Sequence, residues 1–592
     1  MKPRRRPRGQ TSWLGALAIL VPLIAIAFSP VLVAGYIRLD DHANILDNPD
    51  IQRLSLAGFA AIWTKSDLGF YIPITYSIWW LYAGIANLLG TLKQSAPLFH
   101  ALNLTLHIVN ASMVFSIFQT LLRFARAKPV ALSEVQTRGA ALIAALFFAL
   151  HPAQVETVAW ITELKGGLAG MFGLLGILSY YRSPKKTTPA ILFIAAMLSK
   201  PSAIIFPGVL LLVDRILLGK PLKDSVRAPI FFWIPLLPLA LITKYFQPNL
   251  NMEFIPSFSQ RLLVATDTFS FYVCKLLFPF HLALDYGRSP SFVLHRVPGW
   301  QLALSALLAV AGVAVVLYAL WRPSQSDQDG ARAWRGFVFC GWAIFCLAMA
   351  PVLGLVPFAF QDFTTVADHY LYIPIFGAAL VVLGLLVRLR AAVVSQAISA
   401  VILLGLAALS FSQARHWRST ESLFNHTLEI NPQSYLAHYS LGTELFEAGR
   451  TDAGIAQTLQ CLAINPAYLS AEVALGVAWI QQGKFQNAID HYLSVLGKNP
   501  SIAGKRAPFV SSIHNNLGMA LCQAGRDSEG AEHFKQAVEV DPTSVNGHMN
   551  LGRFALKERR FADAVSHYQA ALALSPSNRE IARFLEFARS RM

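Results

Sequence analysis

Long apolar runs follow one another through the first 411 residues, and they limit what this chain can fold into. The first run, from Trp13 to Tyr36, is long enough to cross the roughly 30 Å hydrocarbon core of a bilayer as one helix. With 55% hydrophobic and only 14% charged residues, the 592-residue chain could not bury all of these runs in a water-soluble core. Backbone polar groups must pair within the segment in lipid, so the sequence predicts an all-α transmembrane bundle.

The basic residues predict how the bundle is oriented. Four arginines at positions 4, 5, 6 and 8 precede the first run, and further basic clusters follow every second run, as the positive-inside rule requires. This topology also explains the net charge of +16, so we expect no nucleic-acid partner. About eleven spans are predicted, at 13–36, 97–122, 139–150, 158–181, 190–199, 203–218, 229–245, 302–320, 337–358, 370–387 and 391–411.

Segment 262–280 is the ambiguous one, since it is apolar but carries Asp267 and Lys275. If it spanned, the basic loop after 302–320 would lie outside, so we place the segment on the outer face. Segments 54–64 and 71–89 are rich in aromatic residues and resemble interfacial helices. An odd number of spans puts the C-terminus on the outer side.

A repeat begins after Arg415, where the sequence becomes amphipathic. Asn-Pro, Asp-Pro or Ser-Pro pairs and Leu-Gly pairs recur with the tetratricopeptide period of about 34 residues, with a surface insertion at 501–510. Each Gly lets two helices of a hairpin approach closely, and each Pro follows the second helix. We therefore predict a basic cytoplasmic N-terminus at 1–12, a transmembrane domain at 13–411 with its first outer loop at 37–96, and about four repeats plus a capping helix within 412–592.

An acidic stretch, 39–50, follows the first span on the outer side. Asp40 and Asp41 lie at its start. A carboxylate near apolar surface and near another carboxylate has a raised pKa and can take a proton from a hydroxyl. The alternative is that Asp40 and Asp41 have no catalytic role and are solvated acids at the edge of the membrane. Of the two we favour Asp41, although adjacent residues point in different directions and the sequence does not choose.

Other polar residues are predicted near the same side. His100, the outermost of four polar residues on one helical face with Asn103, His107 and Asn110, either contacts a ligand or bonds a neighbouring helix. Glu156 and Glu163 would share a face if helical, and Lys165 either contacts a ligand or compensates Glu163.

Lys200 lies on the outer side against the charge bias, so an anionic partner is expected. A lipid phosphate leaving group would suit it, whereas snorkelling to the headgroups is the alternative. Asp368 and His369 lie in the same outer region, and His369 could assist the same phosphate. Aromatic residues beside them would also fit an interfacial belt.

These segments together resemble the transmembrane and tetratricopeptide-repeat-containing (TMTC-like) O-mannosyltransferases and their bacterial relatives, within the GT-C glycosyltransferases. The resemblance covers nearly the whole chain and is carried by the motifs at 40–50, 99–107, 151–160, 199–201 and 368–374. Two positions depart from it: relatives read roughly Glu-Arg-Lys-Asp where this chain reads Glu163-Leu164-Lys165-Gly166-Gly167, and they often carry Arg in place of His369.

The resemblance implies an inverting transfer of mannose or another hexose from a polyprenyl-phosphate-linked donor to a protein Ser or Thr hydroxyl on the non-cytoplasmic face. It implies Asp40 and Asp41 as catalytic residues. It also implies an integral protein of the bacterial inner membrane with its repeats in the periplasm. The donor site would then use His100, Glu156, Lys165, Lys200, Asp368 and His369. Some GT-C enzymes use a divalent metal, but no ligand set in this sequence demands one.

Two other functions remain open at this stage. A membrane-anchored repeat protein could serve as a non-enzymatic scaffold for envelope assembly, and a polysaccharide polymerase or ligase would differ only in its acceptor. The repeats carry no chemistry of their own. They either hold an acceptor protein on their concave surface or dock onto the membrane domain.

Overall fold

The computed structural model describes residues 10–65, 71–125, 132–246, 254–321, 333–390, 392–498, 507–575 and 578–592. Within these ranges the chain is helical and has no strand. It divides into two compact units, Met1–Pro432 and Gln433–Met592. The second unit therefore begins at Gln433, whereas the predicted repeat domain begins at residue 412. The four N-terminal arginines and most of the 501–510 insertion lie outside the described ranges.

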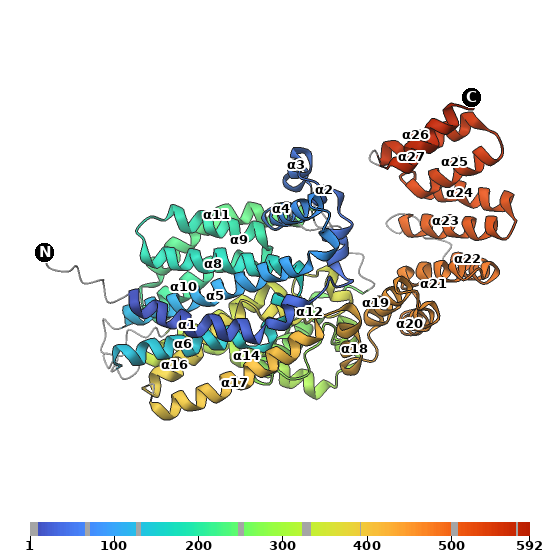
Figure 1. The fold of residues 1–592 in the computed structure, drawn as a ribbon. Coiled ribbons are helices and arrows are strands. Elements are labelled where there is room, and N and C mark those ends of the chain that lie inside the picture. The colour runs from blue at the N-terminus through green and yellow to red at the C-terminus, as the bar shows by residue number, and fades with distance from the viewer. Residues whose placement is uncertain are drawn as a thin grey trace. The chain divides into compact units, whose positions relative to one another are not determined.

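Every predicted span of the first unit contains one helix (Figure 1). These helices are α1 (Gln10–Ala27), α5 (Ala96–Ala125), α6 (Glu134–Leu150), α8 (Leu164–Arg182), α9 (Thr187–Ser199), α10 (Phe206–Leu212), α11 (Leu222–Phe246), α14 (Gly299–Trp321), α15 (Ala333–Met349), α16 (Pro374–Arg388) and α17 (Val393–His416). Among the described residues, six helical segments are long and apolar enough to cross a membrane, and a seventh crossing would combine α6 with Pro152–Ala159 across a 55° bend. The count of eleven spans stays a prediction.

Apolar side chains cover the outside of the first unit. In α14 only 17% of the most apolar window is buried, and Leu304, Leu307 and Val310 are exposed. Helix α17 is buried to the same extent. Large exposed apolar surfaces of this kind mark contact with lipid or with another protein.

Basic residues gather at one end of the bundle. The Arg182 guanidinium, at the end of α8, donates to Thr120 Oγ1 of α5 at 3.1 Å. Gln136 at the start of α6 donates to the Arg390 carbonyl, just past α16, and Arg215 donates to the Leu320 carbonyl at the end of α14. These contacts join helix ends that are far apart in sequence, and the last turns of α5, α8 and α16 carry the basic residues Arg123, Arg182 and Arg388.

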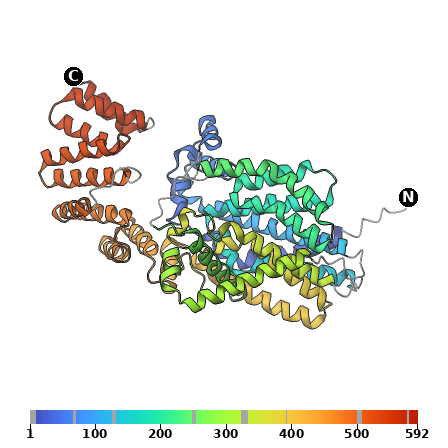
Figure 2. The ribbon, with the colours of Figure 1, turned by 180° about the vertical axis from the view of Figure 1, so that it is seen from behind.

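Short helices gather at the opposite end from the start of α1 (Figure 1, Figure 2). Figure 1 labels α2 (Pro49–Gln52), α3 (Leu56–Thr64) and α4 (Pro73–Leu88) there. Two further short helices of the first unit are α7 (Val155–Ala159) and α13 (Pro290–Arg296). Helices α3 and α4 occupy the two segments predicted to be interfacial helices. The ambiguous segment forms α12 (Phe258–Leu277), which is not among the candidate membrane-crossing helices.

The second unit is a stack of helical hairpins (Figure 1). Each Leu-Gly pair lies where two helices cross: a Cβ on Gly518 would stand 2.7 Å from the Phe534 ring, and one on Gly552 would stand 2.9 Å from the Tyr568 ring. The predicted role of these glycines is thereby confirmed. The hairpins are α19 (Tyr435–Glu447) with α20 (Thr451–Ile464), α21 (Leu469–Gln481) with α22 (Phe485–Lys498), α23 (Ala507–Gln523) with α24 (Asp527–Val540), and α25 (Val545–Lys557) with α26 (Phe561–Leu574), capped by α27 (Arg579–Arg589). One more helix, α18 (Thr420–Ile430), precedes these hairpins and belongs to the first unit.

Candidate active site at the acidic end of the bundle

Asp41 is fully buried and accepts three hydrogen bonds. Its Oδ1 accepts from the Thr162 hydroxyl at 2.7 Å and from the Thr162 backbone N–H at 3.1 Å, and its Oδ2 accepts from the Ile37 N–H at 3.0 Å. Burial raises the pKa of Asp41 to about 6, against the three hydrogen bonds, which favour the charged form. This carboxylate therefore ties the outer loop to the segment before α8.

Asp40 differs from its neighbour because it is partly exposed. Its carboxylate makes no hydrogen bond to any other residue that the structure describes. Burial against apolar surface and the nearby Glu163 raise the pKa of Asp40, whereas Lys165 and His369 lower it. The Asp40 carboxylate thus lies beside a group of charged residues and has oxygens available to accept a proton, which a general base needs.

Glu163 is at the centre of that charged group. It is fully buried and forms ion pairs with Lys200 Nζ at 2.8 Å and with Lys165 Nζ at 3.2 Å. The Nε2 of His369 lies 3.8 Å from the same carboxylate. Lys200 thus has the anionic partner that the sequence predicted, but the partner is a residue of this chain.

Glu156 supports the other side of His369. Its Oε1 lies 2.7 Å from His369 Nδ1, and its Oε2 accepts the Asp368 backbone N–H at 2.9 Å. The Asp368 carboxylate in turn accepts the Tyr286 hydroxyl at 2.7 Å. The imidazole therefore lies between two glutamates, and its hydrogen bond to Glu156 orients the ring.

The two glutamates would share a face only if 156–163 were one helix, and the structure shows a break there. Helix α7 ends at Ala159, because Trp160 takes an extended conformation with φ −82° and ψ 116°. A short 3₁₀ helix, Ile161–Glu163, follows before α8 begins. The break turns the chain so that Glu156 and Glu163 approach His369 from two sides.

The polar face of α5 points into the bundle, as predicted. All four side chains are at most 5% exposed. Each one bonds the backbone of another segment: His100 lies 3.2 Å from the Gly35 carbonyl, while Asn103, His107 and Asn110 bond the carbonyls of Trp160, Ala149 and Gly167. These contacts favour a structural role, since they fix the backbone next to the site. His100 contacts the loop that carries the acidic stretch and is not part of the Glu163 group.

A small cavity adjoins the charged group. It measures about 30 Å³, and Lys200, His369 and Tyr370 contribute to its walls. That volume holds about one water molecule. In the described part of the chain, no group of three or more His, Cys, Asp or Glu side chains is placed to hold a metal ion.

Two residues escaped the sequence analysis. Thr162 contacts Asp41 across 121 positions of sequence, and no local pattern marks it. Tyr286 contacts Asp368 from the loop between α12 and α13. The polar run Asp285-Tyr286-Gly287-Arg288, after a long apolar segment, was the available signal for that loop.

The acidic stretch is also fastened to the segment that follows α17. The Gly35 N–H donates to the Arg418 carbonyl at 3.1 Å, and the Arg38 N–H donates to Thr420 Oγ1 at 3.0 Å. The segment that follows α1 and the segment that follows α17 therefore meet beside the candidate site.

Comparison with known proteins identifies the repeats and shows relatives that match most of the chain. The sequence profile described as "Tetratricopeptide repeat" matches residues 439–501 and 505–579. Over 513 residues the chain is 23% identical to "Protein O-mannosyl-transferase TMTC4" of Mus musculus, which covers 74% of this chain and 66% of that protein. The Homo sapiens protein of the same name is 21% identical over 406 residues, 60% of this chain and 53% of the relative. The chain thus spans between about half and two thirds of the length of these two relatives.

Among solved structures, one described as a thermophilic TPR protein in Thermus thermophilus is 20% identical. The match covers 32% of this chain and 95% of that chain, with a TM-score of 0.25.

Proposed function

We propose that this chain, a homologue of proteins named TMTC O-mannosyl-transferases, is an integral membrane glycosyltransferase of the GT-C type. In this proposal it moves mannose or another hexose from a polyprenyl-phosphate-linked donor to a Ser or Thr hydroxyl of a protein. The observation that carries the proposal is the buried charged group around Glu163. This group lies at the end of an apolar bundle, beside Asp40, whose carboxylate makes no hydrogen bond to another described residue.

Asp40 is the proposed base, in place of Asp41, which the sequence favoured but which is fully buried and accepts three hydrogen bonds. The Asp40 carboxylate removes the proton of the acceptor hydroxyl, and the hydroxyl oxygen forms a bond to C1 of the sugar. The bond between C1 and the phosphate oxygen breaks, and the lipid phosphate leaves with the electron pair. Such a single displacement inverts the configuration at C1. Asp41, whose two oxygens are already occupied, positions the loop that carries Asp40.

Lys200, Lys165 and His369 are the proposed phosphate-binding groups. Lys200 and Lys165 both pair with the single carboxylate of Glu163, so that carboxylate balances only one of the two lysine charges and the other can pair with a phosphate oxygen. Cations fixed in this way stabilise the charge that develops on the leaving phosphate. The glutamates keep them in place while no phosphate is bound.

The proposed topology has eleven crossings with the basic end of the bundle in the cytoplasm. The acidic end, with Asp40 and the charged group, then lies on the non-cytoplasmic face. For a bacterial inner membrane this face is the periplasmic one, and the odd number of crossings places the repeats in the periplasm. In this position the repeats bind the acceptor protein.

The test uses a strain deleted for this protein and complemented with variants of it. Mass spectrometry of exported proteins should show hexose on Ser and Thr with the wild-type chain and with Asp47→Asn, which changes an exposed acid of the same stretch. Asp40→Asn should give the pattern of the deletion strain. If Asp40→Asn restores the hexose, the scaffold function is favoured. If deletion leaves protein hexose unchanged, the acceptor is not a protein.

A further inference from the structure

A second group of charged side chains lies at the basic end of the bundle, and the proposed transfer does not use it. Its centre is Asp214, which is fully buried in a π-helical turn at Val213–Leu217. Asp214 Oδ2 accepts the Tyr180 hydroxyl at 2.9 Å, and Oδ1 accepts the Tyr181 hydroxyl at 3.1 Å. Lys220 Nζ lies 2.8 Å from Oδ2. Turns of this kind are frequent at functional sites, so we examined the group for a ligand.

The backbone around Lys220 is fixed by hydrogen bonds. The chain turns at Gly219, whose φ of +65° favours glycine, and the Lys220 N–H donates to the Asp214 carbonyl at 2.9 Å. The Lys220 carbonyl accepts from the Arg215 guanidinium at 3.2 Å. The Lys220 side chain is 40% exposed. Its ammonium group is therefore held in place and remains open to a ligand.

Lys186 brings a second cation to the same place. Its Nζ lies 3.8 Å from the centroid of the Tyr180 ring, and Lys220 Nζ lies 5.9 Å from that centroid. Among the described residues, Lys186 forms no ion pair with a carboxylate. Partial burial lowers the pKa of Lys186, and so does the nearby charge of Lys220, whereas Asp214 raises it. The single carboxylate balances one of the two lysine charges, so a second anion would relieve their repulsion.

The surroundings of the two lysines are strongly positive. Residues 180–190 and 212–224 carry six Lys and Arg and only two Asp and Glu. Lys186 is also the N-cap of α9, where the positive end of the helix dipole adds to the potential. A field of this sign concentrates anions near the surface.

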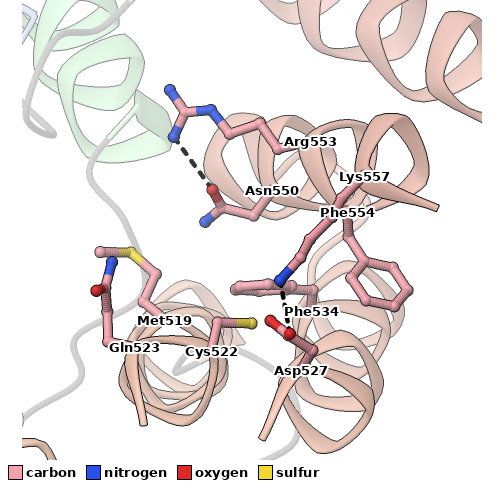
Figure 3. A pocket seen from close by; sticks show the side chains of 9 residues that line it. All are labelled: Met519, Cys522, Gln523, Asp527, Phe534, Asn550, Arg553, Phe554 and Lys557. Atoms are coloured by element: carbon pink, nitrogen blue, oxygen red, sulfur yellow. Dashed lines mark hydrogen bonds and ion pairs between the residues drawn. The ribbon is translucent and has the colours of Figure 1, made fainter. Parts of the chain in front are cut away.

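A cavity of about 340 Å³ in the repeats shows the opposite balance (Figure 3). Each of its two cations has a carboxylate of its own: Lys557 Nζ lies 2.6 Å from Asp527, and Arg553 Nη2 lies 2.8 Å from Glu580. Residues 507–592 carry ten Lys and Arg against nine Asp and Glu. That cavity therefore selects no anion, whereas the two lysines at the basic end share one carboxylate.

An apolar helix surface adjoins the two lysines. The Tyr180 ring contacts Phe232 of α11, with ring centroids 6.1 Å apart. On the same helix the side chains of Ile230, Phe231 and Ile234 are more than half exposed. Acyl chains can pack on such a surface, whereas a free anion makes no use of it. The anion that fits this place is therefore the headgroup of a lipid.

We propose that Lys186 and Lys220 bind the phosphate group of an anionic membrane lipid such as phosphatidylglycerol. The phosphate oxygens accept hydrogen bonds from the two ammonium groups, and the acyl chains lie along α11. Basic pockets between transmembrane helices bind lipid headgroups in this way. In the proposed topology these lipids belong to the cytoplasmic leaflet. The proposal requires a membrane around the bundle but does not depend on the transferase function.

Native mass spectrometry of the purified full-length chain in detergent tests the proposal. The probes are phosphatidylglycerol and phosphatidylcholine with the same acyl chains, because the choline cation neutralises the phosphate of the second lipid. Phosphatidylglycerol should bind about fivefold more tightly or better. Equal binding of the two lipids would overturn the proposal.

Two neighbouring lysines provide a matched pair of variants. Lys186→Gln should lower the affinity for phosphatidylglycerol about fivefold, because one cation beside the headgroup is lost. Lys185→Gln removes the same charge from the adjacent exposed position and should leave the affinity unchanged. Without lipid, both variants should melt like the wild type, since Lys186 has no carboxylate partner among the described residues. Equal affinities of the two variants would show that Lys186 has no special role and would overturn the proposal.

Thermal unfolding with inorganic phosphate separates a lipid from a free anion. Phosphatidylglycerol should raise the melting temperature of the wild type and of Lys185→Gln, and that of Lys186→Gln by less, because a ligand of the folded state stabilises it. Raising the concentration of sodium chloride should reduce this effect. Millimolar inorganic phosphate should neither stabilise the chain nor displace the lipid. Displacement that depends on Lys186 would assign the site to free phosphate and overturn the lipid proposal.

Discussion

Thr162 holds one oxygen of Asp41 with both its hydroxyl and its backbone N–H, at 2.7 and 3.1 Å. The Ile37 N–H donates to the other oxygen and the Asp41 side chain is fully buried, so a substrate hydroxyl does not reach it. Asp40 is partly exposed, and neither of its carboxylate oxygens accepts a hydrogen bond from another described residue. This difference between adjacent aspartates gives them separate roles that experiments can distinguish.

Substituting each aspartate by Asn should separate chemistry from structure. Asp40→Asn removes the proposed base and should lower transfer by about 10²-fold or more while leaving the melting temperature unchanged. Asp41→Asn puts an NH₂ group opposite a backbone donor, which should destabilise the protein by about 1–3 kcal/mol. Transfer assays and thermal unfolding in detergent measure the two effects. Equal loss of transfer with no loss of stability in Asp41→Asn would contradict this division of roles.

Replacing Lys165 should change the pH dependence of transfer. The base must be ionised, so transfer should rise as pH increases through the pKa of Asp40, which burial raises and Lys165 lowers. Lys165→Gln removes the cation, so the pKa of Asp40 should rise further and the acidic limb should move to higher pH. Lys93→Gln, which changes an exposed lysine, is the control and should leave the profile in place. A limb that moves to lower pH would exclude Asp40 as the titrating base.

Replacing Glu163 should show how much its ion pairs with Lys165 and Lys200 contribute to stability. Glu163→Gln leaves Lys200 and Lys165 without their anionic partner, and breaking a buried pair in this way destabilises a protein by about 3–5 kcal/mol. Adding Lys200→Met to Glu163→Gln should recover part of the loss, because one unpaired charge is then removed. Thermal unfolding of the single and double variants tests this. Additive losses would show that Lys200 and Glu163 are not energetically coupled.

Two glycines set the contact of α15 with α16. A Cβ on Gly341 would stand 2.5 Å from the Gly377 carbonyl oxygen and 2.7 Å from the Val381 nitrogen, both backbone atoms that cannot move aside alone. Gly341→Ala should therefore lower stability by about 1–3 kcal/mol. Gly405→Ala on α17 is the control, since a Cβ there meets nothing within 4 Å. Equal melting temperatures of these two variants would contradict the close packing.

The sequence predicts the helices better than it predicts the contacts between side chains. Apolar runs and Leu-Gly spacing are local signals, so every predicted span contains a helix and the repeats match a known profile. The convergence of Glu156, Glu163 and Lys200 on one place was expected only as a shared face of the membrane. Their pairing depends on the helix break at Trp160, and no helix-breaking residue at that position predicts it. Thr162 and Tyr286 were missed because each acts across a long separation in sequence.

The contact of Arg38 with Thr420 also orders events during synthesis. Asp40 leaves the ribosome early and contacts such as that of Asp41 with Thr162 can form next, but the contact of Arg38 with Thr420 can form only after Thr420 has been added. At about 5–20 residues per second, the interval between Asp40 and Thr420 lasts roughly 20–80 s. For that time the acidic loop of the nascent bundle lacks its contact with the segment that leads into the repeats.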